Sequence, residues 1–252
     1  MDLQLKDKFL TLWDKYFGIA ELPISFFFGH NDGTATKVVT NKKWSCIICE
    51  LSQVRRGQSL AFDEQAVLCG GAKRFLGYTD TIRPEFEYFL SCGIPGKLEG
   101  ERYIQTPEMV LELVKKQVTL PSKGKEIIFK RWDKLNANDN PEVILFFATP
   151  DVLSGLFTLA NFDQTRSDST IAPFGSGCAT AIHYPYLEKD KDNPSAVIGM
   201  FDPSARKCVP ADQLTFAVPF KKMVTMIDLM EESFLTTPTW ETVKKRINRT
   251  TI

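Results

Sequence analysis

The sequence predicts an α+β (mixed α/β) fold in which two weakly similar halves pack as one globular unit. Three observations lead to this prediction. Apolar runs typical of strands and amphipathic runs typical of helices occur in similar numbers along the 252 residues. A chain of this length forms one large domain or two small ones. Short landmarks also recur in the same order in the two halves of the chain.

The expected helices follow from apolar side chains at helical spacing and from glycines that end them. At the start of the chain, Phe9, Leu12 and Tyr16 make one apolar face, and Gly18 follows it. The helices predicted in this way cover residues 3–17, 44–55, 69–76, 84–91, 106–117, 151–162, 178–187, 220–234 and 238–248.

The expected strands are short apolar runs bounded by polar or turn-forming residues. Residues 142–148 (EVILFFA) are apolar almost throughout, which indicates a strand buried on both faces. Residues 134–141 and 164–177 are polar or rich in glycine and are expected to be loops. The other predicted strands cover residues 23–28, 59–62, 125–132, 196–201 and 213–218.

Similar landmarks divide the chain into residues 1–135 and 136–252, which we expect to form one continuous structural domain. This arrangement favours an internal duplication, and two unrelated segments of similar composition remain the alternative. The matching landmarks are F-F-x-x-x-D at 27–32 and 146–151, a cysteine that opens a helix at Cys46 and Cys178, and F-D-x-x-x-x-x-C at 62–69 and 201–208.

Composition excludes several classes of protein. The chain has 31 Lys and Arg against 31 Asp and Glu, so it lacks the basic surplus expected for a nucleic-acid partner. No apolar run approaches the roughly 20 residues needed to cross a bilayer, so we expect no membrane span. Residues 1–16 lack the basic and apolar regions of a signal peptide, so we expect a cytoplasmic protein. The sequence lacks the P-loop, G-x-S-x-G and H-E-x-x-H motifs, so it names no reaction.

Cysteine and histidine usage indicates what kind of metal site the chain could form. Six cysteines and two histidines are present, and a long chain without a signal peptide is expected to keep its thiols reduced. Two halves packed about a pseudo-twofold axis would bring equivalent cysteines together, and four thiolates are the ligand set of an iron–sulfur cluster or a structural zinc ion. The predicted metal ligands are Cys46, Cys69, Cys178 and Cys208.

Cys46 and Cys49 form a C-x-x-C pair that places both sulfurs on one helix face. This spacing occurs in metal and redox sites, but the two isoleucines between the cysteines are also typical of a helix packed in a core. Both interpretations stay open on the sequence alone.

Glycines lie next to two of the cysteines, before Cys178 and after Cys69, and suggest an anion site. The turn before Cys178 is expected to present the sulfur at a helix N-terminus, which stabilises a thiolate and binds anions. Such turns equally permit close helix packing. The predicted ligand-binding residues are Gly70, Gly71, Gly175, Ser176 and Gly177.

Several segments resemble the uncharacterised archaeal conserved region family, domain of unknown function 169. These segments are PISFFF at 23–28, WSC at 44–46, CGGA at 69–72, GSGC at 175–178 and FAVP at 216–219. The resemblance spans nearly the whole chain and implies a soluble, cytoplasmic, prokaryotic protein whose family centres on cysteines like Cys46, Cys69 and Cys178.

Three hypotheses about function follow. The first is a cysteine-lined centre between the halves that binds an iron–sulfur cluster or another metal such as zinc, with Cys208 or Cys49 as the fourth ligand. The second is a module that binds a small anionic metabolite, in which the cysteines are structural. The third is a structural or homo-oligomerisation subunit, which predicts a large apolar interface and no ligand.

Overall fold

The computed structural model describes residues 1–40, 43–120 and 124–249. These residues form ten α-helices around one eight-stranded mixed sheet, which confirms the predicted α+β class. The strands are β1 (Ile24–Gly29), β2 (Thr36–Lys37), β3 (Leu60–Phe62), β4 (Glu126–Arg131), β5 (Val143–Ala148), β6 (Thr170–Ile171), β7 (Ala196–Gly199) and β8 (Leu214–Pro219).

The helices lie close to their predicted positions, with ends shifted by a few residues. The π-helix η2 (Ala179–His183) and α7 together replace the single helix expected at 178–187, and short 3-10 turns η1 (Trp132–Lys134) and η3 (Phe234–Thr236) are additional. The α-helices are α1 (Leu3–Phe17), α2 (Ile47–Arg55), α3 (Gly70–Phe75), α4 (Phe86–Leu90), α5 (Pro107–Lys116), α6 (Pro150–Asn161), α7 (Tyr184–Glu188), α8 (Pro203–Arg206), α9 (Phe220–Leu229) and α10 (Pro238–Ile247).

The order of strands in the sheet is β2-β3-β4-β1-β5-β8-β7-β6. The order is equivalent on both sides of the central β1–β5 pair. Outward from β1 the strands are β4, β3 and β2, and outward from β5 they are the corresponding β8, β7 and β6. The directions match as well, since β2 is parallel to β3 and β6 is parallel to β7, while the remaining neighbours are antiparallel. The duplication itself stays a prediction, and this symmetry of strand order supports it.

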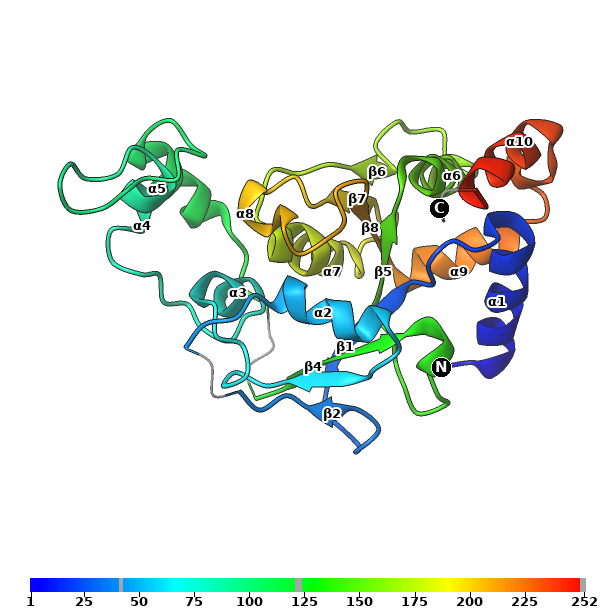
Figure 1. Ribbon diagram of the computed structural model, residues 1–252, viewed down its shortest axis with the longest axis horizontal. Helices are drawn as coiled ribbons and strands as arrows, with labels where there is room; N and C mark the ends of the chain where they lie inside the picture. Colours follow the sequence, from blue (N-terminus) through cyan, green and yellow to red (C-terminus); the bar gives the residue numbers. More distant parts are fainter. Residues whose placement is uncertain (41–42, 121–123, 250–252) are drawn as a thin grey trace.

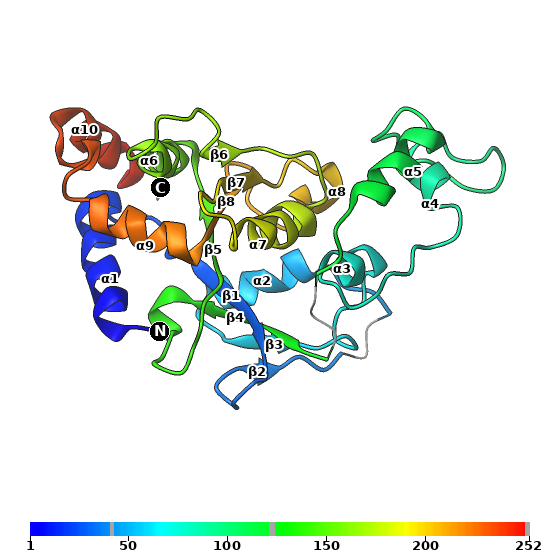
Figure 2. The same cartoon turned by 180° about the vertical axis from the view of Figure 1, so that it is seen from behind.

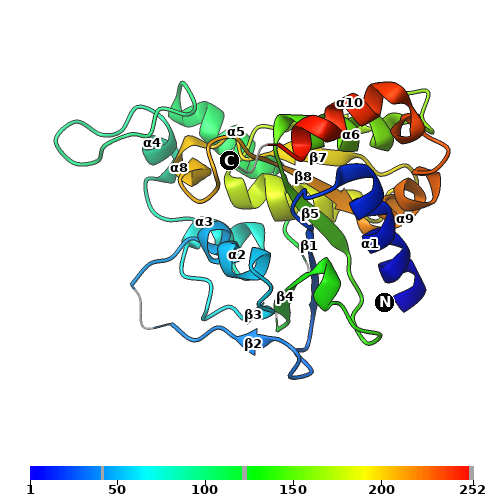
Figure 3. The same cartoon turned by 45° about the vertical axis from the view of Figure 1, so that its right-hand side comes forward.

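The sheet separates two apolar clusters, each covered by helices (Figure 3). Successive side chains of β5 point to opposite faces, so Leu145 and Phe147 join α2 and η2 on one face, while Ile144 and Phe146 join α1, α6, α9 and α10 on the other. This confirms that residues 142–148 include a strand buried on both faces. Each cluster contains residues from both 1–135 and 136–252.

Helices α4 and α5 pack against each other in an arm that extends away from the sheet (Figures 1 and 2). The arm leaves the body after α3 and returns at β4. Cys92 lies between α4 and α5 in the chain and is exposed.

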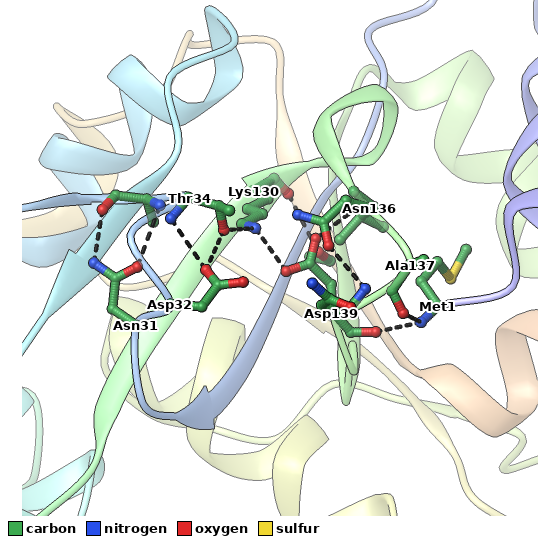
Figure 4. A network of polar contacts seen from close by, with 12 residues as sticks. Met1, Asn31, Asp32, Thr34, Lys130, Asn136, Ala137 and Asp139 are labelled. Atoms are coloured by element: carbon green, nitrogen blue, oxygen red, sulfur yellow. Dashed lines mark hydrogen bonds and ion pairs between the residues drawn. The ribbon is translucent and has the colours of Figure 1, made fainter.

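A polar network with a buried ion pair at its middle joins β4 to the loop at 134–141 (Figure 4). Lys130 on β4 donates from Nζ to Asp139 Oδ1 and to Thr34 Oγ1, each at 2.6 Å. The side chains of Lys130 and Asp139 are only 1% and 3% exposed. Asp139 Oδ2 accepts from the Asn136 amide at 2.7 Å, and the Met1 amino group donates to carbonyls of the same loop. The loop at 134–141 is thereby fixed against the sheet.

One predicted strand is shorter than expected, and three short elements were not predicted. The strand expected at 196–201 ends at Gly199, because Met200 has a positive φ of 68° that turns the chain out of the sheet. Residues 203–206 then form α8, whose Asp202 cap accepts from the Ser204 amide at 2.9 Å. The two-residue strands β2 and β6 at the sheet edges are too short to show an apolar pattern in the sequence.

None of the helices formed by residues 1–40, 43–120 and 124–249 has the length and apolarity needed to cross a membrane.

Candidate functional site

Five of the six cysteines lie on the same face of the sheet, at the ends of helices from both halves. Cys46 caps α2 and Cys49 lies in its first turn, while Cys69 caps α3. In the second half Cys178 begins the η2 region and Cys208 follows α8. Four of them pack against the apolar cluster that contains α2 and η2, and Cys49 is bonded to one of those four. The fold therefore places cysteines of both halves on one face of the sheet, and we call this set the cysteine centre.

The sulfurs of Cys46, Cys49 and Cys208 all lie within 4.8 Å of one another. Cys49 and Cys208, separated by 159 residues, form a disulfide with an S–S distance of 1.99 Å, and Cys46 remains a free thiol. This corrects the expectation from the sequence that all six thiols are reduced. Binding of a metal by Cys208 stays a prediction, and it requires reduction of this disulfide. In this form of the molecule Cys208 is joined covalently to the C-x-x-C helix.

Neither partner of the disulfide was identifiable as such from the sequence. Cys49 is half of a C-x-x-C pair, whose spacing indicates Cys46 as its partner. The structure instead pairs Cys49 with Cys208, because α2 from the first half and the segment after α8 from the second half pack on the same sheet face. Only the three-dimensional packing of the two halves reveals this bond.

The three free thiols at the centre are Cys46, Cys69 and Cys178. Burial raises the pKa of Cys178 to about 12, and negative charge on Cys69 or Cys46 raises that pKa further. Burial also raises the pKa of Cys46, opposed by the amides of Cys49 and Ile48 at the start of α2. The sulfurs thus lie close enough to interact electrostatically, and Cys46 and Cys178 are neutral thiols near pH 7.

The turn before Cys178 does not activate this cysteine as predicted. The Gly177 amide donates to Asp202 Oδ2 at 3.0 Å, and the Ala179 amide donates to Ser176 Oγ at 3.3 Å. Ser176 Oγ also lies 3.2 Å from Cys178 Sγ, which lowers the thiol pKa by less than burial raises it. The prediction of a stabilised thiolate is therefore wrong, because the protein already uses these amides and encloses the sulfur.

The predicted ligand-binding glycines border the cysteine centre. Gly70 and Gly71 begin α3 and are exposed, with open space beyond the Gly70 Cα. Gly177 is buried, and an added Cβ would lie 2.7 Å from Ala205 Cβ. This glycine allows the turn before Cys178 to approach α8 closely. Binding of a ligand by Gly70, Gly71, Gly175, Ser176 and Gly177 stays a prediction.

His183 links the two sides of the centre without pairing with a cysteine. Its Nδ1 lies 2.9 Å from the Phe75 carbonyl oxygen, and its ring contacts the Phe75 ring edge-on at 5.5 Å between centroids. Burial lowers the pKa of His183 below its ordinary value, so the ring is neutral. The hydrogen bond attaches η2 from the second half to α3 from the first half.

Three chain segments that precede cysteines carry exposed aromatic side chains. Trp44, Phe174 and Phe201 lie in the three segments that lead to Cys46, Cys178 and Cys208, and they are 56%, 68% and 54% exposed. Lys207 Nζ lies 5.8 Å from the centre of the Trp44 ring. The sequence alone did not indicate these aromatic residues, since only their exposure distinguishes them from core residues.

The fold and the site together define a class of α+β protein in which two topologically matching halves share a cysteine centre. A family model for domain of unknown function 169, described as an uncharacterised ArCR, matches residues 16–228. The chain belongs to this family, as its glycine and cysteine segments predicted. No match is found among curated proteins or among solved structures.

Proposed function

We propose that the reduced protein binds an iron–sulfur cluster or another thiophilic metal ion at the cysteine centre. Cys46, Cys69 and Cys178 are the ligands, and Cys49 or Cys208 supplies the fourth sulfur after the disulfide is reduced. The observation that carries this proposal is the convergence of five cysteines from four chain segments on one sheet face. Four thiolates suit both iron–sulfur clusters and structural zinc.

The electrostatics of the centre make metal binding depend on the loss of thiol protons. Burial disfavours thiolates at Cys46 and Cys178, and negative charge on one cysteine disfavours it on another. A bound metal cation offsets both the burial of the thiolates and the repulsion between them, because its positive charge neutralises theirs. Each ligand must lose a proton on binding, so metal affinity should rise with pH.

The disulfide and the metal compete for the same sulfur. A disulfide-bonded cysteine provides no thiolate, so Cys208 and Cys49 become ligands only under reducing conditions. A cytoplasmic location, where thiols are kept reduced, is part of this proposal.

Loading of the reduced protein with metal tests the proposal. The protein is reduced under anaerobic conditions and supplied with iron and sulfide, or with zinc, and bound iron, sulfide and zinc are then measured. We expect stoichiometric uptake that is lost in Cys46→Ser, Cys69→Ser and Cys178→Ser. Cys92→Ser is the matched control, since Cys92 is exposed on the α4–α5 arm and should not affect loading.

Two outcomes would contradict the metal proposal. One is a reduced, folded protein that takes up neither metal, and the other is equal loading of Cys92→Ser and Cys69→Ser. Absence of metal uptake is what the remaining hypotheses predict. Of these, the anionic-ligand module places its ligand at the glycine turns of residues 70–71 and 175–177. The oligomerisation subunit is favoured by the exposed Met109, Leu111 and Leu113 of α5.

A further inference from the structure

Cys46 lies beside the disulfide as a third sulfur. Its Sγ is within 4.8 Å of the sulfurs of both Cys49 and Cys208. Cys46 caps α2, and Cys49 lies in the first turn of the same helix, so their sulfurs are on one helix face. Thiol–disulfide exchange requires a thiolate that can reach one sulfur of an existing disulfide. The centre holds both reactants in one place.

We propose that Cys46 exchanges with the Cys49–Cys208 disulfide, so that these three cysteines form a redox couple whose external reductant is a dithiol. This activity goes beyond metal binding and does not depend on it, because the exchange takes place in the metal-free protein.

The internal step moves one bond without changing the oxidation state of the protein. The Cys46 thiol loses its proton to solvent, and the thiolate attacks Cys49 Sγ. A Cys46–Cys49 bond forms while the Cys49–Cys208 bond breaks, and Cys208 leaves as a thiolate that takes up a proton. Attack on Cys208 Sγ instead gives a Cys46–Cys208 bond and frees Cys49.

The external step transfers two electrons. A small or protein dithiol attacks the disulfide, forms a mixed disulfide and then closes its own disulfide, leaving two protein thiols. All three cysteines are partly exposed, so a dithiol can reach them from solvent. When the disulfide joins Cys46 to Cys49, both of its cysteines belong to the first half, and Cys208 is a free thiol.

The pH dependence of exchange follows from the state of the attacking thiol. Only the thiolate form of Cys46 attacks a disulfide sulfur. The exchange rate should therefore rise about tenfold for each pH unit until the thiolate predominates.

Peptide mapping of the metal-free, oxidised protein tests the proposal. Samples held at increasing pH are quenched in acid, their free thiols are alkylated, and the disulfide-linked peptides are identified by mass spectrometry. In the wild-type protein we expect Cys46–Cys49 or Cys46–Cys208 peptides to appear at a rate that increases with pH. The wild-type mapping needs no substitution, so it stays informative if a variant folds poorly.

Variants separate Cys46 from the other free thiols. In Cys46→Ser the disulfide should stay between Cys49 and Cys208 at every pH, whereas Cys92→Ser should behave as the wild type. Persistence of the Cys49–Cys208 bond alone in the wild type across this pH range would overturn the proposal. Bonds to Cys69 or Cys178 without bonds to Cys46 would overturn it too. Failure of metal loading, measured separately on reduced protein, leaves these outcomes unchanged.

Discussion

Replacement of Lys130 by methionine should destabilise the protein strongly, because it leaves a buried carboxylate without its cation. Lys130 Nζ lies 2.6 Å from Asp139 Oδ1, and the two side chains are 1% and 3% exposed. Removal of one partner from a buried ion pair costs about 3–5 kcal/mol. For a chain of this size, that corresponds to a fall of roughly 6–20 °C in the unfolding midpoint.

Thermal and urea unfolding followed by circular dichroism measures this effect. Asp139→Asn should be destabilising as well, since it leaves the ammonium unpaired, and Lys130→Met/Asp139→Asn should recover part of the loss because no charge then stays unpaired. Lys8→Met is the control, because its ion pair with Asp228 is exposed and the midpoint should not move measurably. A double variant that loses the full sum of the two single losses would refute the argument.

Two further substitutions test the packing and the protonation of the core. Gly155→Ala should cost about 1–3 kcal/mol, because the added Cβ would lie 2.3 Å from the Trp240 ring and 2.9 Å from Phe17, and unchanged urea unfolding would contradict the packing described for α6. The neutral ring of His183, whose pKa burial lowers, gains a proton more readily in the unfolded chain. The free energy of unfolding should therefore decrease as pH falls below about 6.5. His183→Asn should weaken this dependence between roughly pH 5 and 7 while keeping a donor toward the Phe75 carbonyl, and an unchanged pH profile would show that His183 is not its source.

The sequence predicted the helices and strands whose own side chains form a regular apolar pattern. The helix at 3–17 and the strand at 142–148 were located well because their side chains alternate between core and solvent, or face the core throughout. The two-residue strands β2 and β6 carry no such pattern, since a neighbouring strand alone defines them. The π-helix η2 differs from an α-helix by one residue per turn, and apolar spacing does not resolve that difference.

The sequence indicated which cysteines correspond in the two halves, but it did not indicate their bonding. Recurrent landmarks indicated that Cys46, Cys69, Cys178 and Cys208 belong to corresponding places in the two halves, and the structure brings them to one sheet face. The Cys49–Cys208 bond depends on contacts between residues 159 apart, which spacing cannot reveal. The raised pKa of Cys178 likewise depends on enclosure by other segments, because its own glycine-rich turn argues for the opposite shift.

The pairing of β1 with β5 is the seam at which the two halves of the sheet meet, and it has a mechanical consequence. Strands β1 and β5 pair over only three residue pairs, whereas β1 with β4 and β5 with β8 pair over six each. Under a load that separates residues 1–135 from 136–252, the short ladder at the seam is the part of the sheet that would yield first. The Cys49–Cys208 bond spans the same boundary and limits its opening. The oxidation state of one sulfur pair thus decides whether the two halves can be pulled apart without breaking a covalent bond.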